Sequence, residues 1–306
     1  MKQAKKNGQL TLAQKRSRVG VLYAIPAMLG FMLFSLIPLL SSFYISLTDY
    51  RIAGLSMNFI GLDNYIRALS GQTIFFYDSV RATFAYVLMV VPSALIFSFL
   101  VAMLLNQKIR GLSVFRTMIY VPNIVPLVAS CIIWMWLFQP NLGIINSMLR
   151  GIGVQGPNWL FDRRTVIPSL AIMNLWASGN VIVIFLAGLQ DCPRQLYEAL
   201  EVDGGNKFHK LLYVTLPFMT PTIFFNLVMQ TIFAFQVFAQ IIMMTGGGPN
   251  NASLVLNYLI YREAFVLHDM GYASALAVML FFIIGLFTLL YFSTAKKWVY
   301  YPEGGG

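Results

Sequence analysis

Six apolar stretches that contain no Asp, Glu, Lys or Arg constrain this chain more than any other feature of its sequence. They cover residues 21–47, 84–105, 117–138, 166–189, 217–244 and 273–292. Each reaches the length of about 20 helical residues that a bilayer core requires. Only 10% of the residues are charged, whereas ordinary soluble domains carry about 25%. The pattern predicts an all-α, multi-pass membrane protein with six transmembrane helices.

Prolines inside these stretches would interrupt the helices of a soluble protein. They include Pro26, Pro38, Pro92, Pro122 and Pro126. In a membrane, neighbouring helices and hydroxyl side chains can satisfy the carbonyls that a proline leaves free. We therefore expect each of the six stretches to form one span.

The cations indicate the orientation, because positive residues concentrate in cytoplasmic segments. With the N-terminus inside, every lysine falls in an inner segment, which predicts that both termini are cytoplasmic. The expected organisation is a basic tail over 1–20, a membrane domain over 21–293 and a tail over 294–306. The first stretch exceeds the 7–15 apolar residues of a signal peptide, so we expect it to be retained.

The net charge of +10 is explained mainly by this topology, with some attraction to anionic membrane lipid. The positive residues are scattered over separate loops rather than gathered into one stripe, which argues against a nucleic-acid partner.

The inner loop 190–216 has the pattern of a helix, a turn and a second helix. Pro193 can start the first helix, because its missing N–H costs nothing there. Gly204 and Gly205 can supply the positive φ angles that end a helix. Asn206 can then cap a second short helix that runs to Thr215, and Pro217 closes the loop as the fifth span begins. Composition alone allows either a solvated surface helix pair or a docking element.

One string in this loop resembles the "EAA" loop of ABC-importer membrane subunits, whose pattern is E-A-A-x-x-D-G-A followed by I-x-L-P. Here the string is Glu198-Ala199-Leu200-x-x-Asp203-Gly204-Gly205, followed by Leu216-Pro217. Residues 186–197, 245–249, 271–275 and 58–65 are similar to the branch that imports sugars and glycerol phosphate, in its first-permease type. Two positions depart from the pattern. Leu200 replaces an alanine, and we expect its bulkier side chain to narrow the choice of ATPase partner rather than abolish docking. Gly205 replaces another alanine with little expected effect.

The resemblance implies a type I ABC-importer permease fold in the cytoplasmic (inner) membrane of a prokaryote. It also implies a mechanical role for the loop, which would seat in a separate ATPase and couple ATP hydrolysis to transport. The coupling residues would be Glu198, Ala199, Asp203, Gly204, Gly205, Leu216 and Pro217. The implied partners are a second, similar permease, two ATP-binding subunits and an extracytoplasmic solute-binding protein.

The chain lacks a G-x-x-x-x-G-K-[ST] phosphate-binding string, so ATP must be used by a partner and no cofactor is expected. No catalytic residues or metal ligands are expected either, because the spans hold no carboxylate pair and His209 and His268 lie far apart in sequence. We therefore expect a transport subunit rather than an enzyme.

The spans contain amide and aromatic residues but no ionisable Asp, Glu, Lys or Arg, which predicts an uncharged substrate path. Amides bind hydroxyls, and aromatic faces stack on sugar rings. Asn226, Gln230 and Phe233 share one helical face. The full candidate set is Asn174, Trp176, Ser178, Asn180, Asn226, Gln230, Phe233, Gln236 and Gln240. Any one of these amides could instead hold the helix bundle together.

The sequence thus favours a permease subunit of an ATP-driven, binding-protein-dependent sugar importer. A glycerol 3-phosphate or polyol importer is the nearest alternative. A stand-alone secondary transporter or channel is a further alternative, and it predicts an intramembrane coupling charge or duplicated broken helices, neither of which the sequence indicates.

Overall fold

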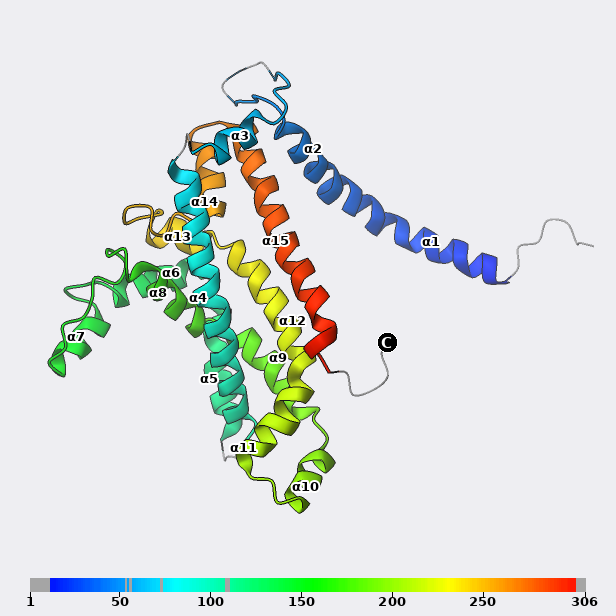
Figure 1. Cartoon of the computed structure of the whole chain (residues 1–306), viewed down its shortest axis with the longest axis vertical. Helices are drawn as coiled ribbons and strands as arrows, with labels where there is room; N and C mark the ends of the chain where they lie inside the picture. Colours follow the sequence, from blue (N-terminus) through cyan, green and yellow to red (C-terminus); the bar gives the residue numbers. More distant parts are fainter. Residues whose placement is uncertain (1–11, 53, 55–56, 72–73, 108–110, 301–306) are drawn as a thin grey trace, which may run out of the picture.

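A computed structural model describes residues 12–52, 54, 57–71, 74–107 and 111–300 of the chain. Most of the predicted tail 1–20 and the end of the tail 294–306 lie outside these residues. Within them the structure is helical, with only two isolated β-bridges, Thr48 to Phe59 and Arg51 to Asp269. The helices form a tall bundle from which one long helix and one short helical arm project (Figure 1).

Four helical runs are long and apolar enough to cross a membrane without interruption. The first run joins α1 (Leu12–Phe31), η1 (Met32–Leu36) and α2 (Ile37–Ile45), and the second is α4 (Ile74–Leu105). The third joins α11 (Lys207–His209), η2 (Lys210–Thr215) and α12 (Leu216–Phe235), and the fourth is α15 (Met270–Trp298).

Two of the expected spans are broken helices rather than single ones. The stretch 117–138 is divided between α5 (Leu112–Ile124) and α6 (Leu127–Leu137), which meet at 100°. The stretch 166–189 is divided between α8 (Val166–Trp176) and α9 (Gly179–Gln190), which meet at 52°. The prediction of six spans agrees with the structure if each bent pair is one span, and two of the six spans are then bent. The fifth stretch also breaks, because α12 ends at Phe235 and α13 (Ala239–Met244) follows separately.

Prolines explain one break and two distortions. Val125 is extended, with ψ at 128°, because the residue before a proline is driven away from helical geometry. Pro126 is then the N-cap of α6. Pro38 and Pro217 lie at the starts of α2 and α12, directly after the π-helical turns η1 and η2. A proline ring collides with the carbonyl four residues earlier, and a π turn relieves this crowding by widening the helix.

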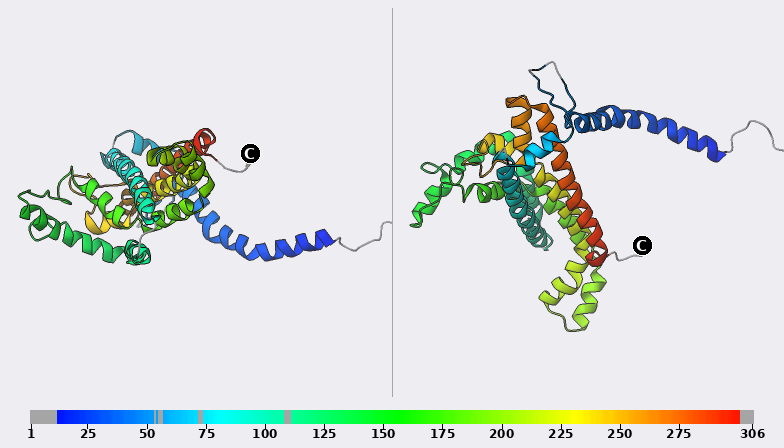
Figure 2. Two further views of the ribbon diagram at one scale, coloured as in Figure 1. Left: turned by 90° about the horizontal axis from the view of Figure 1, so that it is seen from below. Right: turned by 45° about the horizontal axis from the view of Figure 1, so that its top comes forward.

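The core lies where α4, α8, α12 and α15 pack together, around fully buried side chains such as Tyr86, Phe138, Phe235 and Tyr272. The first helical run lies apart from this core. No residue of its most apolar segment is buried. The run packs on the bundle near its C-terminal end, where the ring centre of Phe43 lies 5.9 Å from that of Phe281. Both further views show α1 leaving the bundle sideways (Figure 2).

The remaining helices are short, and all but α7 lie at the two ends of the bundle. One end carries α10 (Arg194–Val202), and we call residues 193–217 the elbow. The opposite end, called the far end, carries α3 (Asp63–Leu69), α14 (Leu256–Tyr261) and the π turn η3 (Arg262–Val266). The helical arm α7 (Ile144–Gly151) projects sideways from the bundle in Figures 1 and 2.

Candidate functional site

The first helix of the elbow ends in a hydrogen-bonded reverse turn. Pro193 is the N-cap of α10 and Asp203 its C-cap. Gly204 follows with φ at +80°, and its N–H donates to the carbonyl of Glu201 at 3.0 Å. The N–H of Gly205 donates to the carbonyl of Leu200 at 2.8 Å. This pair of bonds is the Schellman motif, which requires a left-handed residue and therefore favours glycine at position 204.

Gly205 is needed for a different reason from the one the sequence suggests. Among residues 203–205 only Gly204 has a positive φ. A Cβ atom on Gly205 would lie 2.6 Å from Cγ of Leu200 and 2.8 Å from the Leu200 carbonyl oxygen. The expectation that glycine and alanine are nearly equivalent at position 205 is therefore wrong. The side chain and the carbonyl of Leu200 leave no room for a methyl group there.

The second half of the elbow is the foot of a long helix. As expected, Asn206 caps it: its side-chain oxygen accepts from the N–H groups of Phe208 at 2.9 Å and His209 at 3.0 Å. However, the expected short helix ending at Thr215 does not exist as a separate element, because α11 and η2 continue into α12 as one run from Lys207 to Phe235. Pro217 lies inside this run and does not close the loop.

The coupling residues divide into an exposed set and a half-buried set. Glu198, Ala199, Asp203 and Gly204 are exposed, whereas Gly205, Leu216 and Pro217 are half-buried. Apolar side chains at the tip are also open to the surroundings, since Val202 is 89% exposed and Phe208 is 63% exposed. Between α10 and α12 lies a hollow of about 440 Å³, lined by Ala199, Leu200, Asp203, Pro217 and Tyr300, among others.

Five of the nine candidate path residues line one half-open hollow of the bundle, and we call it the central cavity. Its volume is about 350 Å³. The five are Asn174, Gln230, Phe233, Gln236 and Gln240. The other lining residues are Tyr86, Val90, Leu127, Ala234, Val237, Phe238 and Ala239, so the wall contains no Asp, Glu, Lys or Arg.

The central cavity lies where three helices are interrupted. Leu127 opens α6 after the first break, Asn174 lies in the last turn of α8 before the second, and residues 236–238 separate α12 from α13. Backbone without helical hydrogen bonds is tolerated at membrane depth only where it is buried in protein or lines a cavity. The helix breaks therefore indicate that polar backbone groups of the protein are available at this cavity.

The other four candidate residues lie away from this cavity. The Asn226 amide donates to the carbonyl of Thr222 in its own helix at 3.0 Å. Ser178 donates to the carbonyl of Leu175 at 2.6 Å, and Trp176 packs edge-on against Trp134, with ring centres 6.0 Å apart. Asn180 is exposed. Position on a helical face did not separate Asn226 from Gln230 and Phe233, because the cavity ends before it reaches Asn226.

The sequence prediction missed Tyr86, a fully buried residue of the cavity wall. Its hydroxyl donates to Oε1 of Gln240 at 3.0 Å and so joins α4 to α13. A tyrosine inside an apolar span usually needs a partner for its hydroxyl, and that signal could have identified it.

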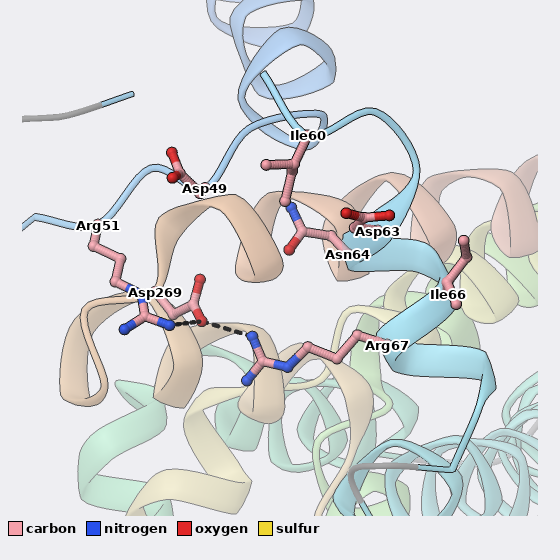
Figure 3. Close-up of a pocket in the computed structure, with 8 residues that line it drawn as sticks. All are labelled: Asp49, Arg51, Ile60, Asp63, Asn64, Ile66, Arg67 and Asp269. Atoms are coloured by element: carbon pink, nitrogen blue, oxygen red, sulfur yellow. Dashed lines mark hydrogen bonds and ion pairs between the residues drawn. The ribbon is translucent and has the colours of Figure 1, made fainter. Parts of the chain in front are cut away.

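A third hollow, of about 410 Å³, lies at the far end (Figure 3). Figure 3 shows Arg51 and Arg67 converging on Asp269, with N–O distances of 3.8 and 2.8 Å. Asp269 also caps α15 by accepting from the N–H of Tyr272 at 3.2 Å. These ion pairs connect both the loop after α2, through Arg51, and α3, through Arg67, to the start of α15. Among the described residues, no group of three His, Cys, Asp or Glu side chains is placed to hold a metal ion.

Comparisons with known proteins agree on the family. Residues 68–298 match the family described as "Binding-protein-dependent transport system inner membrane component". The chain is 38% identical to the probable ABC transporter permease protein YesP of Bacillus subtilis, covering 95% of this chain and 94% of that one. It is 30% identical to the trehalose/maltose transport system permease protein MalF of Thermococcus litoralis, covering 93% and 96%.

The fold is also similar to a solved structure. One chain in the crystal structure of a bacterial alginate ABC transporter, in complex with an alginate pentasaccharide-bound periplasmic protein, matches with a TM-score of 0.81. The match covers 94% of this chain and 97% of that one at 21% identity. This match confirms the expected permease fold. The family match confirms the multi-pass location in the inner membrane and the role as a transport subunit. The chain belongs to the family of inner-membrane permease components of binding-protein-dependent ABC transport systems.

Proposed function

We propose that this chain forms part of the translocation path of an ATP-driven importer of neutral sugars, with the central cavity on the cargo route. One observation carries the proposal: the cavity offers four amide side chains and the aromatic rings of Phe233, Phe238 and Tyr86, without a formal charge. Amides exchange hydrogen bonds with sugar hydroxyls, and aromatic faces cover the apolar faces of sugar rings. The trehalose/maltose function named for the MalF relative supports the same cargo class.

A phosphorylated cargo such as glycerol 3-phosphate fits this wall less well. Phosphate recognition usually uses arginine or lysine donors, and none lines the central cavity. This contrast favours a neutral saccharide over the alternative of a glycerol phosphate importer.

For energy, we propose that the elbow docks on a separate ATPase and that two such subunits serve the complete transporter. Exposed apolar side chains such as Val202 and Phe208 on a polar, water-facing element are typical of an interaction surface. In this proposal both termini and the elbow lie in the cytoplasm, and the position of Tyr300 in the wall of the elbow hollow supports it for the C-terminal end.

A second, similar permease would complete the passage. Two observations support it: α1 leaves the bundle with its apolar surface uncovered, and a hollow of about 1050 Å³ runs along α15 beside Phe281 and Leu286. Lipid covers part of such a surface, but a path enclosed by protein needs helices on its open side.

A transporter working alone would be expected to have broken helices, and two of the spans here are broken. Helix shape therefore does not exclude this alternative. The distinction must come from energy use. The test is uptake into proteoliposomes that hold this chain with its companion permease, its ATPase and its binding protein. Labelled trehalose or maltose should enter only with internal ATP, and glycerol 3-phosphate should not compete. Uptake by this chain alone, or preference for the phosphate ester, would contradict the proposal.

A further inference from the structure

The elbow contains a hydrogen-bonded link between its two helices that the coupling residues do not include. The hydroxyl of Tyr197, in α10, lies 3.0 Å from Oγ1 of Thr215, at the end of η2. Oγ1 of Thr215 donates its one proton to the carbonyl of Lys210 at 3.1 Å. With that proton on the Lys210 carbonyl, Oγ1 of Thr215 can accept a hydrogen bond from the Tyr197 hydroxyl. The chain Tyr197, Thr215, Lys210 thus runs from α10 into the π turn.

This link lies where movement of α10 would enter the bundle. α10 packs chiefly on η2, and its other connection in the elbow is the glycine turn at 204–205. η2 continues without a break into α12, which carries Gln230 and Phe233 to the central cavity. From Thr215 to Gln230 the helix rises about 22 Å, at about 1.5 Å per residue. A displacement at the foot of α12 is therefore felt at the cavity wall.

The link is better placed to hold the two helices together than the neighbouring ion pair. Glu201 and Lys210 also bridge α10 and η2, but the Glu201 side chain is 58% exposed, and exposed ion pairs contribute little. Thr215 is 8% exposed and Tyr197 is half-buried. Burial raises the pKa of the Tyr197 phenol, so the hydroxyl keeps the proton that it donates.

The π turn adds a reason for a clamp at this position. A π turn departs from the regular hydrogen-bond pattern of an α-helix and often occurs at functional sites. Within this turn the Thr215 hydroxyl donates to the carbonyl of Lys210, five residues earlier. A hydroxyl that closes the turn and also holds α10 makes the two helices move together.

We propose that Tyr197 and Thr215 are positioning residues that transmit the movement of α10 to α12, so that the elbow and the foot of α12 move as one body during the ATPase cycle. This inference rests on the proposed docking of the elbow on an ATPase. Neither residue contacts cargo or nucleotide in this account. They act by keeping the distance between α10 and α12 constant.

The test uses spin labels on the full complex in nanodiscs, with ATP and vanadate as the only added ligands. Labels are placed at Gln195→Cys, exposed on α10, and Phe225→Cys, where the native side chain on α12 is 50% exposed. Cys131 and Cys192 are buried, so brief labelling is directed to the new sites. The parent should give one narrow distance that is the same with and without ATP and vanadate.

Removing the link should change that result. Tyr197→Phe and Thr215→Val should broaden the distance in the resting state and shift it on trapping, whereas Thr215→Ser should restore the parent behaviour. Tyr213→Phe is the matched control, because Tyr213 lies in the same π turn with a side chain that is 68% exposed. The ATPase should remain bound in all these variants.

Two outcomes would overturn the inference, and they differ. If Tyr197→Phe and Thr215→Val keep the narrow, unchanged distance while the ATPase binds, the link transmits nothing, although the proposed function stands. If the ATPase fails to bind even the labelled parent, and the unlabelled chain as well, the proposed docking and the inference fail together.

Discussion

Gly204→Val should separate the elbow from its ATPase without unfolding the membrane domain. Gly204 has φ at +80°, and a Cβ atom there would meet nothing within 4 Å. The cost is therefore backbone strain alone, which for an L residue in the left-handed region is roughly 1–2 kcal/mol, with β-branched residues at the upper end. About 2 kcal/mol equals the net contribution of two hydrogen bonds at about 1 kcal/mol each, which is what the turn contains.

A loss of about 2 kcal/mol lowers the population of the native turn relative to its alternatives by roughly 30-fold. The assay is the amount of ATPase that co-purifies with the permease, together with ATP hydrolysis by the complex in nanodiscs. Gly204→Asn should retain both, because asparagine tolerates the left-handed region, and Gly204→Ala should lie between.

Gly153 supplies a matched control. It also follows a helix, α7, with φ at +79° and no atom within 4 Å of a Cβ. Its N–H donates to the Arg150 carbonyl at 3.0 Å, and the next N–H, that of Val154, donates to the Leu149 carbonyl at 2.8 Å. Gly153→Val therefore suffers the same strain outside the elbow and should leave ATPase binding intact. Equal binding and hydrolysis in the two valine variants would refute the assignment of the elbow as the coupling element.

Three further predictions concern the rest of the molecule. Tyr86→Phe leaves the buried Oε1 of Gln240 without its donor and should destabilise the protein by about 1–3 kcal/mol in thermal unfolding. Tyr77→Phe removes an exposed hydroxyl bonded to the Leu69 carbonyl and should destabilise it less. Equal losses of stability would count against the Tyr86 link. Asn146 holds the loop 139–165 together: it donates to the carbonyls of Pro140 at 3.0 Å and Pro157 at 3.1 Å and accepts from Nε1 of Trp159 at 2.7 Å. Asn146→Ala should therefore speed limited proteolysis within this loop, and an unchanged rate would contradict this structural role. Burial raises the pKa of the Glu263 carboxyl, with Arg262 and Arg67 opposing the shift. A carboxyl whose pKa is raised by folding stabilises the folded state at low pH, and this stabilisation is lost as pH rises through the folded-state pKa. Glu263→Gln should therefore stabilise the protein near neutral pH but not at about pH 4, and the reverse pH dependence would disprove the shift.

The number of spans could be read from the sequence, but their shapes could not. Apolar length measures whether a segment can leave water and carries no information on its direction. The 52° bend between α8 and α9 illustrates this: at Gly179, the first residue of α9, a Cβ would lie 3.1 Å from the Ile119 carbonyl of α5. The bend thus coincides with a close approach of a distant segment. Likewise α4 begins at Ile74 and includes Asp78 and Arg81, charges that ended the apolar stretch but not the helix.

The elbow was predicted more completely than the cavity because its signals are local. Pro193, Gly204 and Asn206 act through their own backbone geometry, so residue type and spacing are enough. The cavity wall depends on which faces of α4, α8, α12 and α13 meet. An amide pattern could suggest Gln230 and Gln236, but it could not distinguish them from Asn226, whose amide bonds within its own helix.

Contact between the elbow and an ATPase can be detected by site-directed cross-linking in native membranes. A cysteine at Val202, where the native side chain is 89% exposed at the tip of α10, is compared with one at Ile152, where it is 74% exposed beside α7. Val202→Cys should cross-link to an ATP-binding subunit, whereas Ile152→Cys should not. A cross-link from Ile152→Cys alone, or from neither position in a complex that hydrolyses ATP, would contradict this contact.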